Sequence, residues 1–187
     1  YDPACPSLHW AGNSINGVCS LSKVCYSDYT CKLVDANITS YTLPSGNYAR
    51  SDTISIPYTL KNVGEITWTF LAESGMRKND SSYTYPKNWD SLAPGSSVSK
   101  SITYSIACND PIGRWSADVY AYTDQIVYSG WNVDIKPRNS FNVVECLNDA
   151  DCTACKGSGY FCNTSTNTCM PGCSDDFDCC AALGGPC

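Results

Sequence analysis

The stretch from Asp52 to Phe70 reads DTISIPYTLKNVGEITWTF and contains two runs in which apolar and polar residues alternate. Each run carries its apolar residues at every second position: Ile54, Ile56, Tyr58 and Leu60, then Ile66, Trp68 and Phe70. A period of two places such residues on one face of a β-strand. The turn NVGE at 62–65 separates the runs. We therefore predict two strands with inward apolar faces, joined by a hairpin or a tight corner.

The same alternation continues on both sides of this stretch. Further runs are KLVDANITSYTL at 32–43, SVSKSITYSIAC at 97–108, RWSADVYAY at 114–122 and NSFNVVE at 139–145. In RWSADVYAY, Trp115 and Val119 are predicted to point inward, and Tyr120 and Tyr122 outward. About seven short strands separated by turns are typical of a two-sheet immunoglobulin-type sandwich. We predict an all-β, immunoglobulin-like sandwich for residues 33–145, with small disulfide-rich segments at both ends.

Proline at position 57 interrupts the first of these runs. Because proline has no backbone N–H to give to a neighbouring strand, sheets confine it to edge strands and bulges. We therefore predict an edge or a bulge at Pro57. No run shows helical periodicity with caps, which disfavours a parallel α/β architecture.

Four segments of this region, LVDANITS, TISIPYTLKNVGEITWTF, SLAPGSSVSKSITY and PIGRWSADVYAY, resemble the CARDB-type immunoglobulin-like domains of bacterial and archaeal surface proteins. The resemblance rests on an Asn-x-Gly, a Pro-Gly turn and a Gly-x-Trp, which here are Asn62 with Gly64, Pro94 with Gly95, and Gly113 with Trp115. The insertion MRKNDSSYTYPKNWD at 76–90 is longer than the family usually carries. The resemblance implies an adhesive, spacer or assembly module without catalytic activity.

The cysteine content indicates the compartment. Fourteen cysteines and one histidine in 187 residues favour an oxidising environment, since a reducing cytosol would leave these thiols free. We expect an extracellular or cell-surface protein. A net charge of −6 with scattered Lys and Arg argues against a nucleic-acid partner. No apolar run approaches the roughly 18 residues of a membrane helix, so we expect no membrane span.

The cysteines also divide the chain into an N-terminal cysteine-rich segment at 1–32, the sandwich at 33–145 and a C-terminal module at 146–187. The C-terminal module has too few aliphatic residues for a core, so we predict that disulfides hold it. The predicted disulfide cysteines are Cys5, Cys19, Cys25, Cys31, Cys108, Cys146, Cys152, Cys155, Cys162, Cys169, Cys173, Cys179, Cys180 and Cys187.

The stretch CLNDADCTAC at 146–155 permits two other interpretations. A zinc site would need two closely spaced ligand pairs, and only Cys152 and Cys155 have that spacing. A redox centre would need a βαβ context around the same pair. We favour structural disulfides. Because the C-terminal module holds nine cysteines, an odd number, we predict that one pairs with Cys108; the alternative is a free thiol at Cys108 and another in the tail.

The acidic residues of the C-terminal module could ligate calcium, but no EF-hand spacing accompanies them. These residues are Asp149, Asp151, Asp175, Asp176 and Asp178. We favour solvated acidic loops and predict no metal site.

No catalytic constellation is visible in the sequence. His9 is the single histidine and lacks a nucleophile motif near it. The chain has neither a P-loop nor a dinucleotide fingerprint. We therefore expect no enzymatic activity, no catalytic residue and no cofactor.

Two groups of surface residues remain. The sequons at Asn37, Asn79 and Asn163 predict covalent N-linked glycans on a secreted chain. Aromatic residues also gather in and near the insertion: Tyr83, Tyr85, Trp89, Tyr128 and Trp131. Such rings could cover the edge of the sandwich, stack on a sugar or contact another subunit, and we predict a binding or assembly surface here.

Together these features favour a secreted structural protein whose partners are copies of itself, joined head to tail into an extracellular filament or surface array. Exposed strand edges and residues 1–18 are the predicted means of joining. One alternative is a monomeric adhesion or glycan-binding module that uses the aromatic residues. Another is an inhibitor-like or toxin-like knot in the tail, suggested by CSDDFDCC at 173–180.

Overall fold

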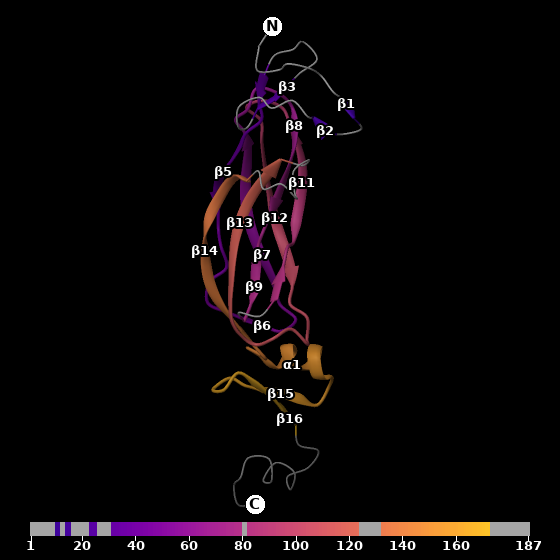
Figure 1. Cartoon of the computed structure of the whole chain (residues 1–187). Helices are drawn as coiled ribbons and strands as arrows, with labels where there is room; N and C mark the ends of the chain where they lie inside the picture. The colour runs from indigo at the N-terminus through magenta and orange to yellow at the C-terminus, as the bar shows by residue number, and fades with distance from the viewer. Residues whose placement is uncertain are drawn as a thin grey trace, which may run out of the picture.

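The computed structural model describes residues 31–79, 82–123 and 132–172, together with strand pieces at 10–11, 14–15 and 23–25. This part of the chain forms a β-sandwich followed by a small disulfide-rich module (Figure 1). The predicted all-β fold class is therefore confirmed. Among these residues, no helix is both long and apolar enough to cross a membrane.

The smaller sheet of the sandwich has three antiparallel strands in the order β12–β7–β5. These strands are β12 (Ser97–Ser105), β7 (Thr53–Asn62) and β5 (Ala36–Tyr41). Strand β7 is the central one and pairs with β12 over nearly its whole length.

The larger sheet is built around β13 (Gly113–Thr123) and β14 (Asn132–Val144). On one side of β13 lie β8 (Trp68–Glu73) and β9 (Met76–Lys78). Strand β8 pairs in turn with β11 (Lys87–Leu92), and β9 pairs with β10 (Ser82–Thr84). On the far side of β14, β6 (Asn47–Ala49) runs parallel to residues 142–144. The segment before β7 thus contributes one strand to each sheet.

Short elements lie at the two ends of the sandwich. The pairs β1 (Trp10–Ala11) with β2 (Ser14–Ile15), and β3 (Lys23–Cys25) with β4 (Cys31–Leu33), precede it in the chain. Helix α1 (Asp149–Lys156) and the hairpin β15 (Tyr160–Asn163)–β16 (Thr168–Pro171) follow it. Figure 1 places β3 at one end of the long axis and α1, β15 and β16 at the opposite end.

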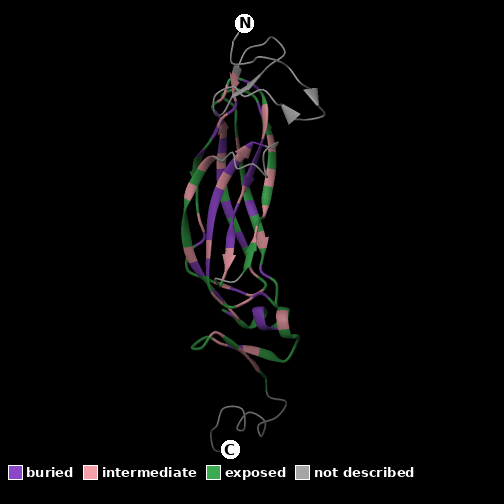
Figure 2. Ribbon diagram, viewed as in Figure 1, coloured by how far each residue is buried: buried purple, intermediate pink, exposed green. Residues whose placement is uncertain are grey.

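The core lies between the two sheets and is made by the predicted inward positions. Buried and exposed residues alternate along the strands (Figure 2), as the period-two pattern requires. The largest fully buried side chains of this core are Trp115, Phe70, Ile54, Ile56, Leu60, Met76, Ile102, Ile106, Val34, Val119 and Val143. Tyr120 and Tyr122, predicted to point outward, remain half-buried.

The turn after β7 is a corner between the sheets and not a hairpin, because β7 and β8 belong to different sheets. Asn62 is fully buried there, and its side-chain amide donates to the carbonyls of Ile66 and Leu92, each at 2.8 Å. Its Oδ1 accepts from the N–H of Gly64 at 2.8 Å. A Cβ at Gly64 would lie 2.6 Å from the carbonyl oxygen of Leu33, so only glycine fits this corner.

Pro57 does not lie on an edge strand, so that alternative of the prediction was wrong. The bulge in the β5–β7 pairing falls between Ile38 and Ser40 of β5, not at Pro57 itself. The pairing of β5 with β7 ends at Tyr41 and Tyr58, one residue before the proline is reached. The N–H of Thr42 still donates to the Pro57 carbonyl at 3.0 Å. Proline is tolerated because its missing N–H faces the side where β5 has already left the sheet.

The insertion at 76–90 contains strands that its polar sequence did not predict. It forms β9, β10 and most of β11, which extend the larger sheet. Near the end of the described chain, CLNDADCTAC includes all but the last residue of the eight-residue helix α1. Asn148 caps this helix by accepting from the N–H of Ala150 at 2.9 Å, while Asp151 accepts from the N–H of Asn148 at 2.9 Å.

Candidate functional site

Exposed aromatic side chains lie on the outer side of the larger sheet. Tyr83 is 48% exposed, Tyr85 53% and Trp89 45%, which are large values for such residues. The rings of Tyr83 and Tyr85 stack with centroids 6.1 Å apart and an angle of 8° between their planes. The guanidinium of Arg77 lies 5.8 Å from the Tyr83 ring centroid. Tyr128 and Trp131, predicted to join this group, lie outside the described residues.

Strand register connects these side chains to two further tyrosines. Trp89 pairs with Leu71, and Leu71 pairs with Tyr122, so Trp89 and Tyr122 share one face of the sheet. Burial raises the pKa of Tyr122, and the nearby Glu73, Asp118 and Tyr85 raise it further. The rings of Tyr120 and Tyr122 lie 5.8 Å apart. We call Tyr83, Tyr85, Trp89, Tyr120 and Tyr122 the aromatic surface.

A buried carboxylate supports this surface from below. Asp118 accepts hydrogen bonds from the Gly75 N–H at 3.0 Å, the Tyr120 hydroxyl at 2.6 Å and the Arg138 Nε at 2.9 Å. Burial together with this carboxylate raises the pKa of Tyr120 to about 12. Asp118 is 4% exposed, so it fixes the position of Tyr120 within the aromatic surface and is not presented to solvent.

The outer face of the smaller sheet has a different chemistry. Its outward positions carry hydroxyl side chains almost throughout: Thr39, Ser40, Thr53, Ser55, Thr59, Ser97, Ser99, Ser101, Thr103 and Ser105. Some of them pair across strands, as Thr59 does with Ser99 at 2.9 Å and Thr53 with Ser105 at 3.2 Å. We call this set the hydroxyl face.

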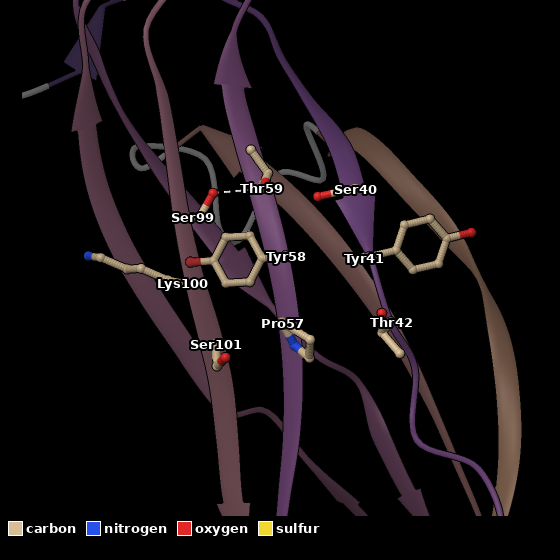
Figure 3. Close-up of a pocket in the computed structure, with 9 residues that line it drawn as sticks. All are labelled: Ser40, Tyr41, Thr42, Pro57, Tyr58, Thr59, Ser99, Lys100 and Ser101. Atoms are coloured by element: carbon tan, nitrogen blue, oxygen red, sulfur yellow. Dashed lines mark hydrogen bonds between the residues drawn. The ribbon is translucent and has the colours of Figure 1, made fainter.

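A shallow groove of about 410 Å³ crosses the hydroxyl face. It forms where β5 leaves the sheet, so that Tyr41 and Thr42 stand on one side and Ser99 and Ser101 on the other, with Pro57 between (Figure 3). Figure 3 shows Lys100 pointing away from the groove centre, and its ammonium pairs with Asp90 at the edge facing β11. No carboxylate lines the groove. No pattern in the sequence predicted this groove.

A disulfide joins Cys108, in the loop after β12, to Cys155 on α1. The expected cross-link between the sandwich and the C-terminal module is thus present in the structure. Lys156 pairs with Glu145 at 3.1 Å, and the same carboxylate accepts from the Cys169 N–H at 3.2 Å. Burial would raise the pKa of Glu145, but these two partners lower it below its usual value. The module is therefore fastened both covalently and electrostatically.

Two more disulfides, Cys146–Cys162 and Cys152–Cys169, form the core of the module. The sulfurs of Cys146, Cys152 and Cys162 lie within 4.8 Å of one another, close enough to suggest a metal centre. In this structure all three belong to disulfides and offer no thiolate, so the arrangement fits a staple. Cys25 and Cys31 are register partners in the β3–β4 pair. The side chains of Cys5, Cys19, Cys25 and Cys31, and all of Cys173, Cys179, Cys180 and Cys187, lie outside the described residues.

The prediction of solvated acidic loops was wrong for Asp151, whereas Asp149 is exposed but lies in helix α1 and not in a loop. Asp151 is buried and accepts from the N–H groups of Leu147 at 2.7 Å and Asn148 at 2.9 Å. Asp149 accepts from the Cys162 N–H at 2.8 Å. Asp151 thus holds backbone donors at the start of α1, and Asp149 connects the helix to β15. Negative charge at this end of α1 is also favoured by the helix dipole. Asp175, Asp176 and Asp178 lie outside the described residues.

An ion pair holds the loop that carries Cys108. The ammonium of Lys78 lies 2.7 Å from Asp110 and 4.6 Å from the centroid of the Tyr104 ring. Asp110 also accepts from the Tyr104 hydroxyl at 2.8 Å and from the Ala107 N–H at 3.0 Å. Burial would raise the pKa of Asp110, but these hydrogen bonds lower it, while the pKa of Lys78 is raised despite its burial. Both groups are therefore held in their charged forms.

The three predicted glycosylation asparagines have different surroundings. Asn37 is exposed and pairs in register with Lys61, which places it on the hydroxyl face. Asn79 is exposed but has a φ of 39°, and its side chain leaves no room for a Cβ at Gly113. Asn163 is half-buried, and its Oδ1 accepts from the Ser165 N–H at 3.1 Å. Asn37 is thus the sequon most fully presented to solvent on a regular strand.

No family of known sequences matches the chain, and no curated protein matches it. Solved structures resemble it at low identity. An alkylpurine DNA glycosylase of Pseudomonas fluorescens is 13% identical with a TM-score of 0.46, over 58% of this chain and 30% of the glycosylase chain. A β-glucosidase of Erythrobacter marinus is 10% identical with a TM-score of 0.41, over 59% of this chain and 16% of the other.

A CARDB domain of Pyrococcus furiosus, solved in complex with di-metal ions, also resembles the chain. It is 11% identical with a TM-score of 0.40, and the match covers 60% of this chain and 94% of that domain. The chain therefore spans less than a third of the two enzymes and nearly all of the CARDB domain. At these scores, none of the similarities bears on the activity or partners of this chain.

Proposed function

We propose that this chain is a non-catalytic structural protein of the cell exterior, whose copies assemble head to tail into a filament or surface array. The observation that carries the proposal is the aromatic surface. Three large rings, those of Tyr83, Tyr85 and Trp89, are each about half exposed on one sheet. Aromatic side chains in such a group are typical of a protein interface, since burying them contributes much of its stability.

The arrangement of the ends supports a head-to-tail contact. The β3 strand lies at one end of the long axis, and the module of α1, β15 and β16 lies at the other (Figure 1). The Cys108–Cys155 disulfide ties that module to the sandwich. Two different surfaces at opposite ends make a heterologous contact, which propagates as a fibre when its rotation does not close.

Strand edges are a second predicted means of contact. Residues 133–141 of β14 pair with β13 on one side, and on the other side Asp134 accepts from the Ile38 N–H at 2.7 Å and Asn139 donates to the Pro44 carbonyl at 2.9 Å. The edge of β12 is covered by β11, because Asn88 donates to the Ser101 carbonyl at 3.0 Å and Lys100 pairs with Asp90. A segment of a second copy, such as residues 1–18, would have to displace these side-chain contacts to add to either edge.

Sedimentation velocity of oxidised protein over a range of concentrations tests this proposal. We expect species far larger than the 20.3 kDa chain, and their loss in the triple variant Tyr83→Ala, Tyr85→Ala and Trp89→Ala. The variant Tyr41→Ala is the matched control, because Tyr41 is an exposed tyrosine on the opposite sheet. A wild-type chain that remains monomeric at high concentration, with residues 1–18 freely cleaved by protease, would contradict the proposal.

A further inference from the structure

The groove on the hydroxyl face has the chemistry of a site for a neutral ligand. Its walls carry hydroxyl groups and the ring of Pro57, whereas the ring of Tyr41 points away from the groove (Figure 3). The one charged side chain in its lining, Lys100, is paired with Asp90. The lining therefore offers no unpaired cation to bind an anion and no carboxylate to bind a metal ion. The groove therefore suits a molecule that carries hydroxyl groups but no charge.

Sugars combine the two features that this lining offers to bind. Ser99, Ser101 and Thr42 can each donate and accept a hydrogen bond, as the hydroxyls of a sugar require. The Pro57 ring provides apolar surface for the C–H groups of a pyranose ring. We propose that this groove binds a neutral oligosaccharide.

The same face carries an attachment point for such a ligand. Asn37, the asparagine of the first sequon, lies on β5 four positions before Tyr41. At roughly 3.3 Å per residue, four strand positions span about 13 Å. A short glycan on Asn37 therefore reaches the groove of its own chain, whereas an oligosaccharide from another source would reach it from solvent.

The groove and the acceptance of Pro57 in β7 have the same cause, which is that β5 leaves the sheet at this point. Strand β5 ends at Tyr41, so the sheet narrows from three strands to two at this point. Outward hydroxyls continue along β12 past the groove, as far as Thr103 and Ser105. These two residues provide controls, because they share the chemistry of the hydroxyl face but do not line the groove.

Chemical-shift titration by NMR tests the proposal on protein produced without glycans and with its disulfides oxidised. The probes are N,N′-diacetylchitobiose and a mannose disaccharide. We expect saturable shifts at Thr59, Ser99 and Ser101, with a dissociation constant of about 1 mM, as a shallow groove should give. The variant Ser101→Arg should lose the shifts, whereas Thr103→Arg and the triple aromatic variant should keep them.

A second preparation distinguishes the two sources of sugar. If the Asn37 glycan occupies the groove, the natively glycosylated protein will not respond to the probes, and Asn37→Gln will restore the response. If the ligand is a separate oligosaccharide, both preparations will respond equally. The proposal is overturned if the groove residues shift neither with the probes nor between glycosylated and glycan-free protein. It is equally overturned if the shifts persist in Ser101→Arg.

Discussion

The carboxylate of Asp134 on β14 accepts a hydrogen bond from the backbone N–H of Ile38 on β5 at 2.7 Å. The two residues lie 96 positions apart in the chain and belong to different sheets. Asp134 also pairs with Lys136 at 2.8 Å. The Asp134 side chain of the larger sheet thus accepts the hydrogen bond that a neighbouring strand's carbonyl would accept at the β5 edge of the smaller sheet. This contact closes the sandwich along this side.

Replacement of Asp134 by Ala should open this side of the sandwich. The Ile38 N–H would lose its acceptor while still partly buried, at a cost of about 1–2 kcal/mol in unfolding free energy. Hydrogen exchange at Ile38 should accelerate, and urea denaturation should show the loss of stability. Lys136→Ala is the control, since it leaves the bond to Ile38 in place. Unchanged exchange at Ile38 in Asp134→Ala would show that the bond contributes nothing.

The corner at Asn62 should be among the most sensitive positions of the sandwich. Asn62→Ala leaves the buried carbonyls of Ile66 and Leu92 without their donor, and we expect a loss of about 2–4 kcal/mol. Asn142→Ala, at an exposed asparagine on β14, should change stability by less than about 0.5 kcal/mol. Thermal and urea denaturation measure both. Equal effects at the two positions would contradict the role assigned to Asn62.

Removal of the Cys108–Cys155 disulfide should loosen the C-terminal module without unfolding the sandwich. The double variant Cys108→Ser and Cys155→Ser should lose about 2–4 kcal/mol, since the bond closes a long loop. Limited proteolysis should then cut between the sandwich and the module while the sandwich persists. Resistance equal to that of the wild type would mean that the Lys156–Glu145 pair holds the module by itself.

Acid should weaken the junction between sandwich and module. Hydrogen bonds hold the pKa of Asp110 below its usual value of 3.8 and that of Glu145 below its usual value of 4.5, although burial alone would raise both. A depressed folded-state pKa gives stability that is present above the unfolded value and is lost as pH falls through the folded value. Melting temperature should therefore drop as pH falls below about 4.5. The variants Asp110→Asn and Glu145→Gln should be less stable at neutral pH, and their melting temperature should fall less steeply with pH. A wild-type melting temperature that stays constant from pH 6 to 2 would contradict this prediction.

The core could be predicted because burial along a strand is a local pattern. Spacing alone predicts that Ile54 and Ile56 share one face of their strand, and that Trp115 and Val119 do so in theirs. Each of these side chains is fully buried. The partners of the strands could not be predicted in this way. The turn at 62–65 suits a hairpin and a corner equally, and the difference lies in contacts of Asn62 with Leu92, 30 residues away.

The surface features could not be predicted because they depend on pairing between strands that lie far apart in the sequence. Trp89 and Tyr122 share one face through the register of β8, β11 and β13, which no alternation in the sequence specifies. The groove arises where β5 leaves the sheet, and only the pairing shows where that is. Helix α1 had a usable signal in the capping residues Asn148 and Asp151, but it lacks the apolar periodicity on which a helix prediction rests.

Electron microscopy of the protein, purified from its native source without reductant, tests the central claim of self-assembly most directly. We predict fibres or ordered arrays with an axial repeat near one sandwich length, roughly 45 Å from the 13 residues of β14. Such fibres should be absent for the triple variant at Tyr83, Tyr85 and Trp89. Dispersed particles of about 20 kDa, confirmed by light scattering, would contradict the claim.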